Sequence, residues 1–270
     1  MKRRHFLISA GISGAWIATA SPILVPQTPV WQPDGAGTRG RIGVLTPDFD
    51  PVPESEAWAM APQGVSILAS RVPWKPNDAR TFADAPNVDE AVERLATTKP
   101  QVILYAFTSS SYMLGQDGDK ALRERLERKS QGIPVVLAAE AASEALRALN
   151  LQRIVVVHPP WFDEETNQRG GDYFRDAGFE IISCTTMTPS RPFKEVSAAE
   201  VYDWIKTNVP RQAEGVLLAG NGMRSIGVIK ALEASLNRPV LAANQFTLWQ
   251  GLRVAGITAS ISNYGKLFQL

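Results

Sequence analysis

The segment RIVVVHPP, residues 153–160, holds four consecutive aliphatic side chains and ends in histidine and proline. A short, continuous aliphatic run is typical of a strand in a parallel sheet whose two faces are both covered by helices. The segment GVLLAG, residues 215–220, has the same character. Because such runs alternate with helical patterns along the chain, the sequence predicts an α/β fold.

The alternation extends over most of the 270 residues. We expect strands at 41–47, 64–72, 101–108, 153–160, 180–187, 215–220 and 239–244, and helices at 87–98, 117–130, 143–150, 164–178, 197–209, 225–237 and 245–256. The pattern predicts two similar Rossmann-like lobes with parallel sheets and a ligand cleft between them. The first lobe comprises 41–149 and 245–270, and the second comprises 150–244. Ligands of such sheets bind outside the carboxyl ends of the strands.

Residues 1–20 have the features of an export signal. Basic residues at positions 2–4 precede a modestly apolar run, and Ala18-Thr19-Ala20 has the small residues of a cleavage site. The stretch RRHFL resembles a twin-arginine signal, which the export machinery reads. A membrane anchor is the alternative, but the run is shorter than the ~20 apolar residues that span a bilayer. We therefore expect cleavage near Ser21, a proline-rich linker over 21–40, and a periplasmic or secreted protein.

Charge and cysteine content exclude several classes of function. The 28 Lys and Arg nearly balance the 27 Asp and Glu, without a basic block, so nucleic acid is not an expected partner. One cysteine, Cys184, allows no intramolecular disulfide and no cysteine-ligated metal site. The GNGMRS turn at 220–225 lacks the GxGxxG spacing of a dinucleotide-binding turn, and no P-loop motif occurs in the sequence. We expect neither a metal nor a nucleotide cofactor, and the composition is compatible with an oligomer.

Two turns have the residues of an anion site. Residues 108–111, Thr-Ser-Ser-Ser, follow an apolar strand, where backbone N–H groups and hydroxyls can hold a carboxylate or phosphate. Residues 220–225, GNGMRS, follow a second buried strand and open a helix. The alternatives are a polar loop that caps a helix and an ordinary Gly-Asn turn.

Three other side chains have two readings each. His158, at the end of a strand, is either a general base or a packing residue beside two prolines. Cys184 is either a nucleophile or a small buried hydrophobe. Trp161 belongs either to the core or to a pocket wall.

Four stretches together resemble the aspartate/glutamate racemase superfamily, and within it the branch of maleate cis-trans isomerases and arylmalonate decarboxylases. They are RIGVLTPDFDPVPE at 41–54, YAFTSSSY at 105–112, LLAGNGMRS at 217–225 and AANQFTLWQGLR at 242–253. The resemblance covers residues 41–265. It implies a small carboxylate or dicarboxylate ligand, no cofactor, and substrate-binding roles for Asp50, Thr108, Ser109, Trp161, Asn221, Gly222 and Asn244.

The resemblance also implies catalytic cysteines at two positions, where this chain has Phe107 and Gly220. Cys184 lies outside both motifs. We therefore expect isomerase or decarboxylase-like chemistry without the cysteine pair, with Asp50, His158, Tyr112 or water as the proton source. The alternative is a periplasmic protein that binds a carboxylate without turnover.

Gly220→Cys offers a test of the second cysteine position. If the turn is correctly aligned, this substitution restores a reactive thiol there. The alternative is that Gly220 needs a positive φ or has no room for a side chain.

Overall fold

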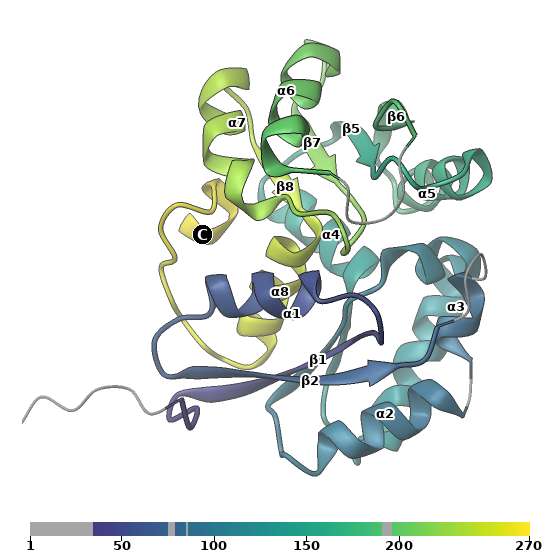
Figure 1. Ribbon diagram of the computed structural model, residues 1–270, viewed down its shortest axis with the longest axis vertical. Coiled ribbons are helices and arrows are strands. Elements are labelled where there is room, and N and C mark those ends of the chain that lie inside the picture. The colour runs from purple at the N-terminus through teal and green to yellow at the C-terminus, as the bar shows by residue number, and fades with distance from the viewer. Residues whose placement is uncertain (1–34, 75–78, 85, 191–195) are drawn as a thin grey trace, which may run out of the picture. The chain divides into compact units, whose positions relative to one another are not determined.

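The computed structural model describes residues 35–74, 79–84, 86–190 and 196–270 (Figure 1). The expected signal peptide and most of the expected linker lie outside the described residues. Within these ranges, no helix is long and apolar enough to cross a membrane.

Two four-stranded parallel sheets form the framework. The first has the order β2-β1-β3-β4, with β1 Gly40–Pro47, β2 Val65–Val72, β3 Val102–Tyr105 and β4 Val135–Leu137. The second has the order β6-β5-β7-β8, with β5 Arg153–His158, β6 Glu180–Thr186, β7 Gly215–Leu218 and β8 Val240–Ala242. The two sheets have the same topology, because β6, β5, β7 and β8 follow the same order as β2, β1, β3 and β4. This confirms the prediction of two similar α/β lobes.

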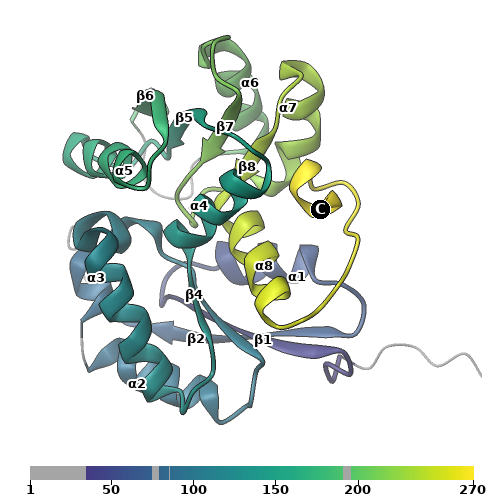
Figure 2. The same ribbon diagram turned by 180° about the vertical axis from the view of Figure 1, so that it is seen from behind.

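Eight α-helices and three short 3₁₀ helices join the strands within the described ranges (Figures 1 and 2). The α-helices are α1 Val52–Met60, α2 Asn87–Ala96, α3 Thr108–Lys129, α4 Ala138–Ala148, α5 Glu164–Asp176, α6 Ala198–Asn208, α7 Ile229–Leu236 and α8 Ala243–Val254. The 3₁₀ helices are η1 Ala79–Ala83, η2 Ile226–Val228 and η3 Lys266–Gln269. Helix α8 packs against α1, α4, β3 and β4, so it lies beside the first sheet.

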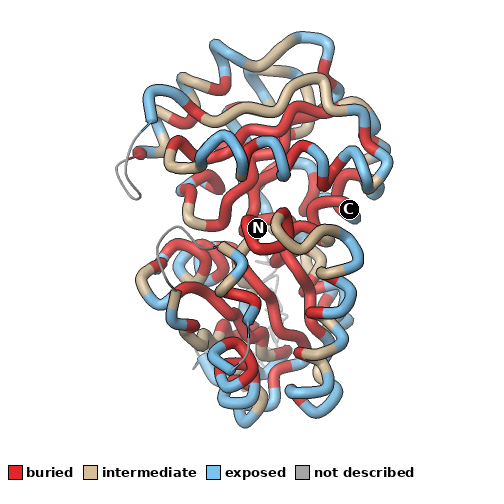
Figure 3. The backbone as a smooth tube through the Cα atoms, turned by 90° about the vertical axis from the view of Figure 1, so that its right-hand side faces the viewer, coloured by how far each residue is buried: buried red, intermediate tan, exposed pale blue. Residues whose placement is uncertain are grey.

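Most residues of the central strands are buried, and Figure 3 shows buried stretches of the backbone in red. In β5, Ile154, Val156 and Val157 are fully buried, and in β7 the same holds for Val216 and Leu217. In the register of β5 and β7, Val156 lies beside Leu217, so aliphatic residues of neighbouring strands are adjacent in the core. This burial is the physical reason for the continuous aliphatic runs of the sequence.

Several elements differ from the expectation, and α4, for example, begins at Ala138 where 143 was expected. Helix α1 occupies residues expected to be a loop, because the prolines at 51 and 53 fit the unpaired first turn of a helix. Helix α3 starts at Thr108 instead of 117, with a break at Gly115, where φ is 69°. Strand β4 was not expected, since three residues are too short to show a periodic pattern.

Helices α3 and α5 join the two halves of the fold through a buried polar contact. The hydroxyl of Tyr173 on α5 donates to Oδ2 of Asp119 on α3 at 2.7 Å. Nε2 of Gln116 donates to the carbonyl of Tyr173 at 3.1 Å. Burial raises the pKa of Asp119 to about 7, so near neutral pH this carboxyl exists partly in the neutral form.

Candidate functional site

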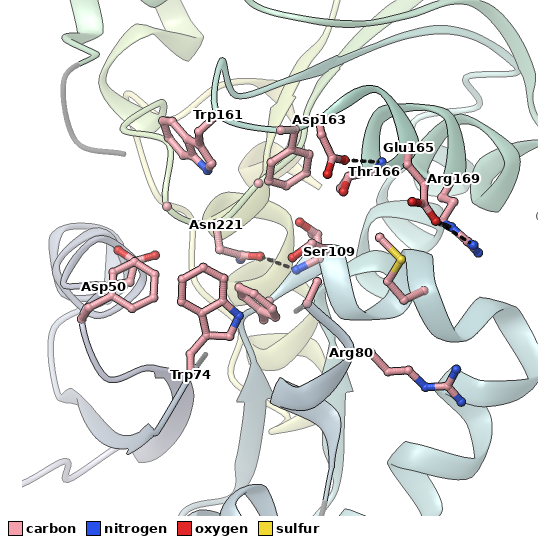
Figure 4. A pocket seen from close by; sticks show the side chains of 18 residues that line it. Asp50, Trp74, Arg80, Ser109, Trp161, Asp163, Glu165, Thr166, Arg169 and Asn221 are labelled. Carbon is pink, nitrogen blue, oxygen red and sulfur yellow. Dashed lines mark hydrogen bonds and ion pairs between the residues drawn. The ribbon is translucent and has the colours of Figure 1, made fainter. Parts of the chain in front are cut away.

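A cavity of about 400 Å³ lies at the carboxyl ends of the strands (Figure 4). The turn after β3 and the turn after β7 both line it, so the two sheets contribute to one site, as expected for parallel sheets. Six of the seven expected binding residues line the cavity, namely Asp50, Thr108, Ser109, Trp161, Asn221 and Gly222. The seventh, Asn244, is buried beside Asn221 and hydrogen-bonds to it at 2.9 Å.

Thr108 and Ser109 form a polar part of the lining where α3 begins. Both are almost completely buried. A side-chain hydrogen bond with Thr108 opposes the rise that burial causes in the pKa of Tyr112, and Oγ1 of Thr108 has no other hydrogen bond among the described residues. Buried hydroxyls are usually paired, because an unpaired one has lost its hydrogen bonds to water. Because a hydroxyl has one donor and two acceptor sites, the Thr108 hydroxyl keeps hydrogen-bonding capacity for a ligand in the cavity that it lines.

Aromatic rings form an apolar part of the cavity lining. Phe107 packs on Phe82 with ring centroids 4.4 Å apart, and edge-on to Trp74 at 6.4 Å. Trp74 in turn contacts Phe49 at 4.9 Å. The Phe107 ring thus belongs to an aromatic wall, which gives the cavity an apolar side suited to an apolar ligand group.

Gly220 has no room for a side chain. Its φ is +99°, and a Cβ built on it would lie 2.8 Å from Cδ and Cγ of Pro159. A side chain here strains the backbone and displaces the proline ring. The structure therefore supports the second of the two readings of Gly220, and the expectation that Gly220→Cys simply restores a thiol does not fit this geometry.

Glu56 does not line the cavity but is hydrogen-bonded to Asn244 beside it, and the sequence reasoning missed this residue. It lies on α1, is 7% exposed, and accepts hydrogen bonds from Nδ2 of Asn244 at 2.7 Å and from the backbone N–H of Ser225 at 3.0 Å. Burial raises the pKa of Glu56 to about 7, and the hydrogen bond from Asn244 opposes that rise. The available signal was a carboxyl on the same helix as the buried residues Val52 and Met60.

His158 and Tyr112 do not line the cavity. His158 is fully buried, with Nδ1 2.9 Å from Oδ1 of Asn167 and Nε2 3.3 Å from the hydroxyl of Tyr112. Burial lowers the pKa of His158 to about 4, so the ring is neutral at pH 7. The packing reading of His158 fits this geometry.

Cys184 lies on β6, behind His158. Its thiol donates to the carbonyl of Asn167 at 3.2 Å. Burial raises the pKa of this thiol to about 12, which removes the thiolate that nucleophilic chemistry needs. The reading as a small hydrophobe agrees with this environment.

Charged side chains complete the lining on the α5 side. The carboxylate of Asp163 caps α5 by accepting from the N–H of Thr166 at 2.8 Å. Arg169 pairs with Glu165 at 2.9 Å, and Arg80 projects from η1 (Figure 4). In the part of the chain that the structure describes, no group of three or more His, Cys, Asp or Glu could hold a metal ion.

The fold and the cavity together define a two-lobed α/β protein with a cavity at the carboxyl ends of two parallel sheets. Residues 42–268 match the family model of arylmalonate decarboxylase, and the chain belongs to this family.

Two characterised relatives are similar in sequence. The arylmalonate decarboxylase of Bordetella bronchiseptica is 25% identical over 186 residues, which cover 67% of this chain and 76% of the relative. The maleate isomerase of Pseudomonas putida is 24% identical over 249 residues, which cover 84% of this chain and 96% of the relative.

Solved structures share the fold. The maleate isomerase Iso of Pseudomonas putida S16 with maleate superimposes with a TM-score of 0.78 at 21% identity, covering 85% of this chain and 97% of that one. An arylmalonate decarboxylase gives a TM-score of 0.71 at 21% identity, covering 85% and 99%. A Nocardia farcinica maleate cis-trans isomerase variant with a covalently bound succinylcysteine intermediate gives 0.77 at 20% identity, covering 85% and 98%.

Proposed function

We propose that this protein is a cofactor-independent decarboxylase of small malonate-type carboxylates that carry an apolar substituent. The observation that carries the proposal is that one cavity joins the buried hydroxyl residues Thr108 and Ser109 to the aromatic wall around Phe107. One end of such a ligand would accept hydrogen bonds from Thr108 and Ser109. The other would lie against aromatic rings.

Family membership and the relatives support a carboxylate ligand. The family is that of arylmalonate decarboxylase, and one structural relative contains maleate. Both names describe compounds with two carboxylates. A cavity of about 400 Å³ lies within the ordinary size range of small-molecule sites.

Decarboxylation fits the lining better than chemistry that uses two thiols. The cavity lining within the described residues contains no cysteine, and the positions implied for the cysteines hold Phe107 and Gly220. In decarboxylation the bond between the α-carbon and one carboxylate breaks, CO₂ leaves, and the electron pair remains as an enediolate. Donors at Thr108 and Ser109 would stabilise the charge on the enediolate oxygens, while the apolar wall would disfavour the leaving carboxylate.

A proton must then reach the α-carbon. Of the four sources expected from the sequence, Asp50 lines the cavity, whereas His158 and Tyr112 do not. Oδ1 of Asp50 accepts from the N–H of Val52 at 2.9 Å, which fixes the direction of the carboxyl group. We assign the proton delivery to Asp50 or to a water bound beside it.

A second candidate is binding of the same carboxylate without turnover. The lack of a cysteine in the described lining favours binding without turnover, because a thiol would be the group best suited to transfer a proton.

One experiment separates the two candidates. Purified protein is incubated with phenylmalonate, maleate, aspartate and glutamate while CO₂ release and product formation are followed, and binding is measured by calorimetry. Release of CO₂ from phenylmalonate supports the decarboxylase, and binding without turnover supports the second candidate. If none of these compounds binds or reacts, both candidates are wrong.

A matched pair of variants tests the assigned residues. Thr108→Val keeps the shape of the side chain but removes the hydroxyl, so affinity for phenylmalonate should fall about tenfold. Thr207→Val on the exposed side of α6 is the control and should bind like the unmodified protein. Equal affinity of Thr108→Val and the control would contradict the role of Thr108.

A further inference from the structure

The side chain of Asn221 occupies the backbone donor of Thr108, a residue that lines the cavity. Its Oδ1 accepts from the backbone N–H of Thr108 at 3.0 Å, across 113 residues of sequence and between the turns of the two sheets (Figure 4). Asn221 is itself 3% exposed and lines the cavity. The amide oxygen therefore stands where a carboxylate oxygen would stand if a ligand were held by this N–H.

The orientation of the Asn221 amide is fixed from both sides. The N–H of Thr108 can only donate, so it must face the amide oxygen. Nδ2 of Asn221 then donates to Oδ1 of Asn244 at 2.9 Å. Nδ2 of Asn244 donates both to the carbonyl of Asn221 at 2.9 Å and to Oε2 of Glu56 at 2.7 Å. The hydrogen bonds from Thr108 to Asn221, from Asn221 to Asn244 and from Asn244 to Glu56 all run in the same donor direction, and reversing either amide would place two donors face to face.

Glu56 also connects this hydrogen-bond network to the segment that follows β7 of the second sheet. Its Oε1 accepts from the N–H groups of Ser225 and Ile226 at 3.0 and 3.4 Å, in the segment that follows the turn of Asn221. The carboxyl thus holds both Asn244 and the downstream end of this turn. Asn221 is fixed against Thr108 by a buried network, and packing alone does not account for its position.

We infer that Asn221 is a built-in occupant of the carboxylate site, which a ligand must displace from the N–H of Thr108, and that Glu56 and Asn244 are the positioning residues that hold it there. This inference rests on the proposed carboxylate-binding function. A carboxylate oxygen makes a stronger, charge-assisted hydrogen bond to a backbone N–H than an amide oxygen does, so displacement is chemically reasonable.

The inference reverses the ordinary expectation for a residue in a binding site. If Asn221 contacted the ligand favourably, its removal would weaken binding. If it competes with the ligand, Asn221→Ala should bind phenylmalonate about tenfold more tightly, which corresponds to about 1.4 kcal/mol. Asn208→Ala on the exposed side of α6 is the matched control and should bind like the unmodified protein.

Calorimetry with phenylmalonate on these three proteins decides between the outcomes. Tighter binding by Asn221→Ala than by both other proteins supports the inference. Equal or weaker binding by Asn221→Ala, with measurable binding by the unmodified protein, overturns the inference but leaves the proposed function standing. If no protein binds, the proposed function fails, and the inference fails with it.

A crystal structure of the unmodified protein with phenylmalonate tests the same point without any substitution. A ligand carboxylate on the N–H of Thr108, with Oδ1 of Asn221 beyond hydrogen-bond distance of it, supports displacement. A bound ligand beside an intact hydrogen bond between Asn221 and Thr108 overturns it. This measurement remains decisive if Asn221→Ala does not fold.

Discussion

Substitution of Glu56 by glutamine should change the pH dependence of stability in a defined direction. Burial raises the pKa of Glu56 in the folded protein from 4.5 to about 7. The folded protein therefore binds this proton more tightly than the unfolded chain does. Protonated Glu56 therefore contributes to the free energy of unfolding. This contribution is fully present below the pKa of the unfolded chain and is lost as the pH rises through the pKa of the folded protein.

The size of the effect follows from the two pKa values. The difference between 4.5 and about 7, at about 1.4 kcal/mol for each pH unit, gives a loss of about 3 kcal/mol across this window. Glutamine does not titrate. The free energy of unfolding of Glu56→Gln minus that of the unmodified protein should therefore rise by about 3 kcal/mol from about pH 4.5 to about pH 8.5.

Urea denaturation of both proteins at the two pH values measures this change. The difference between the two proteins is compared at the two pH values. Effects common to both pH values, such as the weaker hydrogen bond from Asn244, cancel in this comparison. Effects common to both proteins, such as the titration of Asp119 and His158, cancel as well. Glu124→Gln, on an exposed part of α3, is the control and should give the same offset at both pH values. An offset for Glu56→Gln that does not change with pH would refute the reasoning.

Two further predictions concern a turn and the amino-terminal segment. Gly220→Ala should lower the free energy of unfolding by about 1 kcal/mol or more, because φ is +99° and Pro159 lies 2.8 Å from the added carbon. Thermal denaturation measures this change, and an unchanged melting temperature would contradict the prediction. If residues 1–20 are a twin-arginine signal, combined Arg3→Lys and Arg4→Lys should leave an uncleaved precursor in the cytoplasm, as cell fractionation would show. Normal export of that variant would exclude the twin-arginine route.

Local patterns sufficed for much of the fold. The aliphatic runs at 153–160 and 215–220 predicted buried parallel strands, because a strand covered on both faces cannot alternate apolar and polar residues. The rule that ligands bind at the carboxyl ends of parallel strands then placed Thr108 and Asn221 at one cleft. Both residues line the cavity.

Motif resemblance extended this to the identity of the site. The stretch at 242–253 pointed to the family that the comparison shows, and six of the seven residues assigned through the resemblance line the cavity. These motifs are readable from sequence because each is a short, contiguous stretch of the chain.

Short and irregular elements were less accessible. Three-residue β4 has no period to detect, and the beginning of α3 carries hydroxyl residues that are equally common in turns. Helix α1 was hidden by the prolines at 51 and 53, which terminate helices elsewhere but fit a first turn.

What the sequence determined by itself was the succession of strands, helices and turns, since these follow from neighbours along the chain. Only the tertiary structure decided how distant groups meet. It brought Glu56 to Asn244 over 188 residues, placed the amide of Asn221 on the N–H of Thr108, and buried His158 away from the cavity. Hydrogen-bond partners and pKa values depend on distances through space and on desolvation, and neither is a property of a local stretch of sequence.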